Sequence, residues 1–348
     1  MIDDSSTFDL VNAIDSMLGE HPPSGEIKPE FLESVLEIAT IPCPDVPSVA
    51  DELAALRGYA RDRARGLGLQ IGAAGTHPFA RWEDQRVVSD DRYRGLISAL
   101  GFVARQELVF GMHVHIGMAD PEEAVYVANA LRPYIPLLIA LSANSPLWRG
   151  SPTGLASSRV PIFRAFPRVG LPPRFDGWHD FERRVETLTA SGAIEDYTFL
   201  WYDVRPHPRL GTIEIRAMDS QTRIEHTVAL CALIVSLVKL LVEQAHDGVP
   251  VADPAWELLD ENRWLAARHG LAAELVDEPS ASRVGVRELT ASLLEQLAPH
   301  ASELGCASEL EGIGDVLRSG NGALRQQMVY EANHDLRELM SEIVARTA

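Results

Sequence analysis

The side chains best suited to chemistry in this sequence begin with two histidines in one short segment. In GMHVHIG, residues 111–117, His113 and His115 alternate with apolar residues. Because successive side chains of a β-strand point to opposite faces, a strand here places both imidazoles on one face and the apolar side chains on the other. The flanking glycines leave the histidine face uncrowded. The pair is compatible with metal binding, with acid–base catalysis or with a passive structural role.

A second segment with the same alternation follows later in the chain. In LGTIEIRAM, residues 210–218, Thr212, Glu214 and Arg216 share one face of a predicted strand, and apolar residues occupy the other. Glu214 beside Arg216 is either a surface ion pair, worth about 0–1 kcal/mol, or a metal-binding carboxylate next to a guanidinium that holds a phosphate or carboxylate at two points. Two such strands predict an active site on the open face of a sheet.

The residue types around these strands narrow the class of ligand. Arg205, Arg209 and Arg216 fall within one predicted hairpin of a chain whose net charge is −19, which indicates an anionic ligand. HExxH and CxxC motifs are absent from the sequence, so magnesium held by carboxylates is favoured over zinc. Walker-type, GxGxxG and GxSxG signatures are also absent, so any nucleotide binds in a less common way. The acidic candidates are Glu30, Glu33, Glu37 and Glu214.

The overall composition restricts the partners and the compartment. The 348 residues include 50 acidic and 31 basic side chains, which argues against nonspecific nucleic-acid binding. Cys43, Cys231 and Cys306 lack metal-type spacing and fit a reducing cytoplasm. The N-terminus has no apolar signal-peptide core, and the most hydrophobic run, 227–242, is too short for a membrane span and contains Lys239. We expect a cytoplasmic protein with small-molecule substrates and no nucleic-acid or membrane partner.

Strands and helices are predicted in a definite order. Residues 31–39 fit a strand or a helix, and residues 144–178, rich in Pro, Gly, Ser and Arg, predict a long ordered loop. Two strands over 199–218 predict a hairpin. The sequence pattern also predicts a helix that begins after Pro47-Ser48, a strand over 69–72 and a helix over 91–108. A further helix is predicted from Asp120 to Ser142, with kinks at Pro133 and Pro136. Strands before residue 222 and helices over 223–348, with breaks near 250–254 and 278–282, predict one α+β catalytic domain spanning 1–348.

Besides the two-histidine strand, the chain contains the segments ESVLEIAT (33–40), GTHPF (75–79), ALSANSP (140–146), ASSR (156–159), DVRP (203–206), GTIEIR (211–216) and NRW (262–264). These segments, taken in order, resemble those of glutamate–cysteine ligase family 2, the ATP-dependent carboxylate–amine ligases. Such an ordered series is more specific than any single motif. The resemblance implies a glutamine-synthetase-like antiparallel sheet with an open catalytic face, backed by helices, and a helical C-terminal part, and it is compatible with a homo-oligomer.

The resemblance also implies a reaction and a set of residue roles. The side-chain carboxylate of glutamate would attack the γ-phosphate of ATP, and the amine of cysteine would displace phosphate to give γ-glutamylcysteine. Mg²⁺ or Mn²⁺ would be the cofactor and ATP the co-substrate. By position, Glu214 and Arg216 would be catalytic, and Glu33 would support the site from outside. The metal ligands would be Glu30, Glu37, His113 and Glu214, and the substrate and nucleotide pocket would be lined by His115, Arg159, Arg205, Arg209 and Thr76.

One departure from the family pattern leaves alternatives open. Family members usually open with a Gly-x-Glu-x-Glu strand, whereas this sequence begins MIDDSSTFDL, so we expect that strand and one or two of its carboxylates to be missing. The first alternative to an active, or weakly active, ligase is a truncated or non-catalytic member that binds nucleotide or amino acid. The second is a metal-dependent hydrolase that uses His113, His115 and Glu214.

Overall fold

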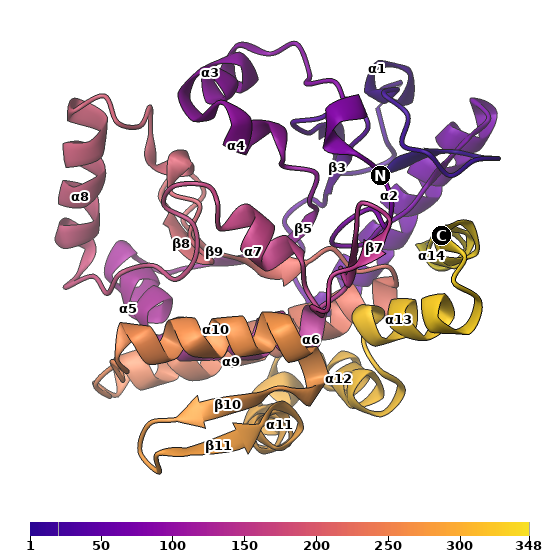
Figure 1. Ribbon diagram of the computed structural model, residues 1–348. Helices are drawn as coiled ribbons and strands as arrows, with labels where there is room; N and C mark the ends of the chain where they lie inside the picture. The colour runs from indigo at the N-terminus through magenta and orange to yellow at the C-terminus, as the bar shows by residue number, and fades with distance from the viewer. Residues whose placement is uncertain (20, 348) are drawn as a thin grey trace.

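The computed structural model describes residues 1–19 and 21–347, with a small central sheet surrounded by helices (Figure 1). The strands occur throughout the chain, including its C-terminal third. They are β1 (Ile2–Asp4), β2 (Glu26–Pro29), β3 (Leu36–Ala39), β4 (Leu69–Ile71), β5 (Gly111–Gly117), β6 (Leu147–Trp148), β7 (Ser151–Pro152), β8 (Val204–His207), β9 (Thr212–Asp219), β10 (Glu274–Asp277) and β11 (Ser282–Gly285).

Helices make up most of the remaining structure. The 3₁₀ turns are η1 (Trp82–Asp84), η2 (Arg132–Tyr134), η3 (Tyr197–Phe199) and η4 (Gly270–Ala272). The α-helices are α1 (Ile14–Met17), α2 (Val46–Gly66), α3 (Asp91–Leu100), α4 (Phe102–Arg105), α5 (Pro121–Leu131), α6 (Ile135–Ser142), α7 (Arg159–Phe163), α8 (Trp178–Ala190), α9 (Ile224–His246), α10 (Trp256–His269), α11 (Val286–Glu303), α12 (Ala307–Ser319), α13 (Gly322–Asn333) and α14 (Leu336–Thr347).

The two strands predicted to carry the reactive side chains are neighbours in one antiparallel sheet. Its order is β5-β9-β8, so β9 is central. His115 of β5 and Arg205 of β8 both pair with Glu214, one from each side, and the register of β5 shifts between Met112 and Val114. The other strands form two-stranded pairs, β1–β4, β2–β3, β6–β7 and β10–β11. The predicted α+β class is confirmed, and the strands are divided among several small sheets.

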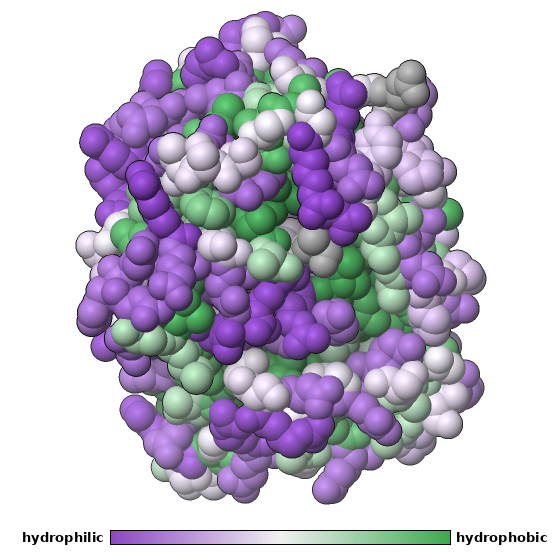
Figure 2. Space-filling model, turned by 90° about the vertical axis from the view of Figure 1, so that its right-hand side faces the viewer, coloured by the Kyte–Doolittle hydropathy of each residue, from purple (hydrophilic) through white to green (hydrophobic). Residues whose placement is uncertain are grey.

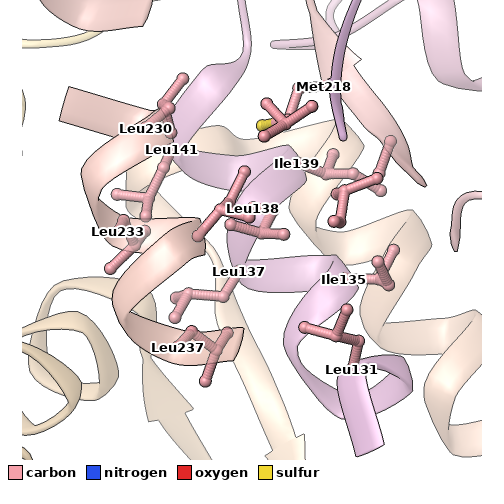
Figure 3. Close-up of a cluster of buried hydrophobic side chains, with 14 of the residues drawn as sticks. Leu131, Ile135, Leu137, Leu138, Ile139, Leu141, Met218, Leu230, Leu233 and Leu237 are labelled. Atoms are coloured by element: carbon pink, nitrogen blue, oxygen red, sulfur yellow. The ribbon is translucent and has the colours of Figure 1, made fainter. Parts of the chain in front are cut away.

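The apolar face of the central sheet rests on the core helices. Figure 3 shows Met218 of β9 beside leucines and isoleucines of α6 and α9. Ile213, Ile215 and Ala217, the apolar side chains that alternate with Glu214 and Arg216, are at most 2% exposed. The side predicted to be apolar is therefore buried, and the reactive residues are presented on the other side of the sheet.

Two aspartates begin the helices that frame this core. Asp45 accepts a hydrogen bond from Ser48 N at 2.8 Å at the start of α2, and Asp120 accepts one from Glu123 N at 2.9 Å at the start of α5. Each satisfies a main-chain N–H that the first helical turn leaves unpaired. The predicted start of a helix at Asp120 is confirmed. The predicted kink is also present, since η2 separates α5 from α6.

Other predicted elements differ from the structure. Gly101 has φ of 57° and splits the helix predicted over 91–108 into α3 and α4. Residues 31–39 form a turn followed by the strand β3, and the predicted loop 144–178 contains β6, β7 and α7. Strands β10 and β11 lie on either side of the predicted break near 278–282, where the pattern predicted helix. They pair with each other and β10 packs on α10, so strand pairing and packing outweigh the helical pattern.

Two helical segments are long and apolar enough to cross a membrane, Pro121–Ser142 and Ile224–His246. Their most hydrophobic windows are 78% and 61% buried inside the protein. Both contribute to the core in Figure 3, as expected of core helices. Figure 2 views the molecule from the side of α2 and α14, where hydrophilic side chains cover most of the surface and smaller hydrophobic areas lie between them.

Candidate active site

Glu214 lies at the centre of the reactive sheet face, and two arginines hold its carboxylate. It is only 3% exposed. Its Oε2 accepts hydrogen bonds from Arg205 Nη2 at 2.6 Å and Nε at 3.1 Å, and its Oε1 accepts one from Arg216 Nη1. Burial alone would raise the pKa of Glu214, but the charges of Arg216 and Arg205 outweigh burial and hold that pKa well below its usual range. Glu214 is therefore an anion at any physiological pH.

The two histidines of β5 approach the same carboxylate. His113 Nδ1 and His115 Nε2 each lie 3.7 Å from Glu214 Oε1, and His115 Nδ1 lies 3.0 Å from the Thr212 hydroxyl. Burial lowers the pKa of His113, and Arg216 lowers it further. Burial also lowers the pKa of His115, although Glu214 opposes this shift. Both imidazoles are neutral near pH 7, which is the state a metal ligand requires.

The β2–β3 hairpin brings a second group of acids to this face. Glu37 of β3 pairs with Lys28 at 3.5 Å, and Glu30 directly follows β2. Burial, and then the charge of Glu37, raise the pKa of Glu30 to about 7; a hydrogen bond between the two carboxyl groups acts in the same direction, while Arg216 opposes it. Glu30 is thus a neighbour of both Glu37 and Arg216, which links the β2–β3 hairpin to β9.

Glu107 is a further acid of this region that the sequence analysis missed. Burial and then Glu30 raise its pKa to about 8, whereas Arg159 and Arg216 oppose this shift. Glu107 precedes His113 by an even number of residues, so an extended backbone would place the two side chains on the same face. This even spacing was the sequence feature that could have identified Glu107. It was not used because the helix predicted over 91–108 included Glu107.

The donor set suits a divalent cation by its chemistry. Carboxylates are the ligands that Mg²⁺ prefers, and a bound cation would relieve the unfavourable proximity of Glu30 and Glu37. The predicted ligands form two pairs, Glu30 with Glu37 and His113 with Glu214, and Arg216 interacts with both pairs. Within the described residues, no group of three or more histidine, cysteine or acidic side chains is arranged to hold a metal ion. The metal set therefore stays a prediction.

Arg205 is oriented toward Glu214 and main-chain atoms. Besides Glu214, its guanidinium donates from Nη1 to the carbonyl oxygens of Thr198 at 2.7 Å and Leu200 at 2.9 Å, and the residue is 4% exposed. With these bonds its donors are engaged by the protein, so in this arrangement Arg205 holds Glu214 in place and does not line an open pocket.

Three other predicted residues lie at the edge of the site or outside it. Thr76 is buried and donates its hydroxyl to a main-chain carbonyl oxygen at 2.8 Å. Arg209, at the hairpin turn, is largely exposed and pairs with Asp196 at 3.3 Å. Glu33 pairs with Arg86 at 2.7 Å. The structure does not bring Thr76 or Arg209 to Glu214, and the supporting role of Glu33 stays a prediction.

Arg159, by contrast, is brought to the site from a distant segment. It begins α7 within the predicted loop 144–178 and is 5% exposed. Its guanidinium donates to the carbonyl oxygens of Arg216 at 3.1 Å and Ala217 at 3.2 Å, next to the predicted catalytic side chains on β9. This segment therefore contributes a buried cation to the site.

A cavity of about 470 Å³ lies away from these residues, beside α5, and none of its lining residues belongs to the site. Its carboxylates already serve the fold: Asp120 caps α5, Glu122 accepts from Trp178 N at 3.0 Å, and Glu123 accepts from Ala119 N at 2.8 Å. We assign this cavity no part in the chemistry.

The α+β fold gathers neutral imidazoles, carboxylates and guanidiniums on one sheet face. The fold is similar to that of a crystallised glutamate–cysteine ligase from Francisella tularensis in complex with AMP, with a TM-score of 0.70 and 12% identity over 100% of this chain and 86% of that chain. At this identity the likeness establishes the fold alone.

The family follows from sequence comparison. The model of "Glutamate-cysteine ligase family 2" matches residues 7–344, and the chain belongs to this family. It is 41% identical over 346 residues to "Putative glutamate--cysteine ligase 2-1" of Rubrobacter xylanophilus, covering 99% of this chain and 92% of that protein. A relative named "Putative glutamate--cysteine ligase 2" from Sorangium cellulosum is 37% identical over 349 residues, covering 99% and 93%. The family resemblance inferred from the motifs is confirmed.

Proposed function

We propose that this protein is an ATP-dependent glutamate–cysteine ligase. The reaction joins L-glutamate and L-cysteine to give γ-glutamylcysteine, ADP and phosphate. The observation that carries the proposal is the convergence of Glu214, Arg216 and His113 on one sheet face in a chain whose residues 7–344 match a glutamate–cysteine ligase family. We place the reaction in the cytoplasm, with one catalytic domain formed by residues 1–222 and 223–348 on a glutamine-synthetase-like sheet.

The chemistry needs two balanced steps. An oxygen of the glutamate side-chain carboxylate attacks the γ-phosphorus of ATP, and the bond to the β-γ bridging oxygen breaks to release ADP. The cysteine amine then attacks the acyl carbon of γ-glutamyl phosphate, and phosphate leaves with the bonding electron pair while the amine loses a proton. During transfer the negative charge is spread over the phosphoryl oxygens, so preorganised cations such as Arg216 stabilise this stage.

The chain's own residues have distinct roles in this proposal. Glu30, Glu37, His113 and Glu214 would hold Mg²⁺ or Mn²⁺, which when bound neutralises phosphate charge. Arg216 binds the anionic group under attack, since a guanidinium contacts two oxygens at once. Arg205 keeps Glu214 ionised and oriented. His115, supported by Thr212, borders the substrates beside Glu214.

ADP release tests the proposal directly. The 348-residue chain is incubated with Mg-ATP and glutamate, with and without cysteine, and ADP and γ-glutamylcysteine are quantified. Release that requires both amino acids, with product in equal amount, is the expected result. Binding of nucleotide without any release identifies a non-catalytic member. Hydrolysis of a substrate without ATP identifies a metal-dependent hydrolase, and either outcome overturns the ligase assignment.

A further inference from the structure

Asp219, at the end of β9, is a buried carboxylate to which none of the functional roles above is assigned. It is 1% exposed, yet it accepts three hydrogen bonds: Oδ2 from Asn144 N at 2.8 Å and Ser145 Oγ at 2.6 Å, and Oδ1 from Ser157 Oγ at 2.8 Å. A buried charge is costly unless it is hydrogen-bonded in this way. Asp219 thereby joins β9 to both ends of the segment that leads into α7.

These bonds continue to Arg159. The Ser145 hydroxyl, which donates to Asp219, accepts a hydrogen bond from Arg159 N at 3.2 Å, and Ser158 N donates to Ser145 O at 2.9 Å. The guanidinium of Arg159 returns to β9, where it donates to the carbonyl oxygens of Arg216 and Ala217. Both the backbone and the side chain of Arg159 are thus held relative to the strand that carries Arg216.

Two glycines make room for this arrangement. A Cβ atom at Gly75 would lie 2.6 Å from Asp219 Cγ, and a Cβ atom at Gly111 would lie 2.5 Å from Arg159 Nη2. Either contact is too short for carbon, so a side chain at Gly75 would displace Asp219 and one at Gly111 would displace Arg159. The glycines of GTHPF and GMHVHIG therefore keep clear the positions of the two charged groups.

The held guanidiniums retain unused donors. Among the described residues, Nε of Arg159 and Nε of Arg216 are buried and have no hydrogen-bond partner. The charge of Asp219 favours the protonated form of Arg159 against the cost of burial. Two unsatisfied N–H groups of cations on adjoining parts of one site indicate a binding place for an anion.

We propose that Asp219 is a positioning residue for the ligase reaction: through Ser145 and Ser157 it holds Arg159 behind Arg216, which leaves the Nε–H groups of both arginines for one anionic group of the substrates. That group is a phosphate of ATP or a carboxylate of an amino-acid substrate. The inference rests on the proposed function only for the identity of the reaction. The positioning itself rests on the chain of hydrogen bonds that links Asp219 through Ser145 to Arg159.

The test is a double-mutant cycle of Asp219→Asn and Arg159→Lys. Asparagine retains the size of Asp219 and can still accept from Asn144 and Ser145, but it removes the charge. We expect Asp219→Asn to lower kcat/KM by about 10- to 100-fold, as loss of a partner that orients a functional group does. Because Asp219 acts through Arg159, the double variant should lose little more than Arg159→Lys alone. A rise in the KM for ATP identifies a phosphate as the bound group, and a rise for glutamate or cysteine identifies a carboxylate.

A matched control separates positioning from general stability. Asn129→Ala removes two buried hydrogen bonds to the Phe175 backbone, of 2.8 and 3.0 Å, at a place remote from the site. It should lower the melting temperature and change kcat/KM by less than about twofold. If the losses of kcat/KM in the two single variants multiply in the double variant, the proposal is overturned. Full activity of folded Asp219→Asn would also overturn it. If Asp219→Asn does not fold, Ser157→Ala, which removes one of the three donors, takes its place.

Calorimetric titration of Mg-ADP and of each amino acid keeps the two proposals separable. If the wild type binds these probes but releases no ADP, the ligase assignment fails. The double-mutant cycle is then evaluated from the dissociation constants of the probes. If the wild type is active but the cycle is additive, only the positioning role fails. If the wild type binds none of the probes, both fail.

Discussion

The carboxylate of Glu214 is shared by two guanidiniums and approached by two imidazoles. Arg205 occupies Oε2 with two hydrogen bonds, so Oε1 is the oxygen available to a ligand. A cation that binds Oε1 must share it with Arg216 or displace its Nη1, and a displaced guanidinium becomes free to hold an anion. At the residue scale, cation binding and anion binding are therefore coupled through one oxygen atom.

Glu214→Gln tests this coupling. Glutamine removes the negative charge that neutralises Arg205 and Arg216, so kcat should fall by about 100-fold or more. Breaking a buried pair leaves an uncompensated charge, so the free energy of unfolding should fall by about 3 kcal/mol. ADP release and urea unfolding measure the two effects. The matched control is Glu33→Gln, whose partner Arg86 lies outside the site and which should remain active. Near-normal turnover in Glu214→Gln would contradict its role.

At the element scale, the site is assembled from units that are separate in sequence. The β5–β9–β8 sheet supplies the histidines and Glu214, the β2–β3 hairpin supplies Glu30 and Glu37, and α7 supplies Arg159. Helices α5 and α6 support the apolar side of the sheet, and Asp120 caps the start of α5. The supporting helices thus pack on one face of the sheet, and the residues of the proposed site lie on the other.

Asp120→Ala should lower the free energy of unfolding without changing kcat/KM. Loss of the helix cap leaves Glu123 N without its partner and should lower the free energy of unfolding by about 1 kcal/mol. The measurement is the urea midpoint at constant m-value, with kcat/KM determined alongside. Asp62→Ala, at an exposed position inside α2, is the control and should change stability by less than about 0.5 kcal/mol. A loss of activity in Asp120→Ala would show that α5 does more than support the sheet.

At the scale of the whole molecule, the acidic site makes stability depend on pH. The pKa of Glu107 is raised to about 8 from an ordinary value of 4.5, chiefly by burial. Between these values the folded protein keeps a proton that the unfolded chain has released. The free energy of unfolding therefore falls as pH rises, by up to about 1.4 kcal/mol per pH unit from this group, and the contribution is lost once pH exceeds the folded pKa.

Glu107→Gln should flatten this dependence. Glutamine does not titrate, so unfolding free energies measured from pH 5 to 8 without divalent metal should decline less steeply than in the wild type. Glu331→Gln, at an exposed position of α13, should leave the wild-type slope unchanged. Equal slopes in the wild type and Glu107→Gln would mean that Glu107 is ionised throughout this range.

The sequence by itself determined the features that depend on neighbours along the chain. Strand alternation placed His113 with His115 and Glu214 with Arg216, and the observed pairing of His115 with Glu214 joins the two faces. The start of α5 followed from Asp120 and its proline, because capping involves only a few adjacent residues. The ordered motifs identified the family, since many short matches in order are specific.

Only the tertiary structure decided which charges meet. It turned Arg205 toward Glu214 and left Arg209 at the edge, although both belong to one hairpin. It also placed Glu107 beside Glu30 and gave Asp219 its three donors. Burial and through-space contact between distant segments set the protonation and partners of these groups, and no local pattern encodes either. Packing also decided the pairing of β10 with β11, since β10 rests on α10 where the sequence pattern predicted helix around a break.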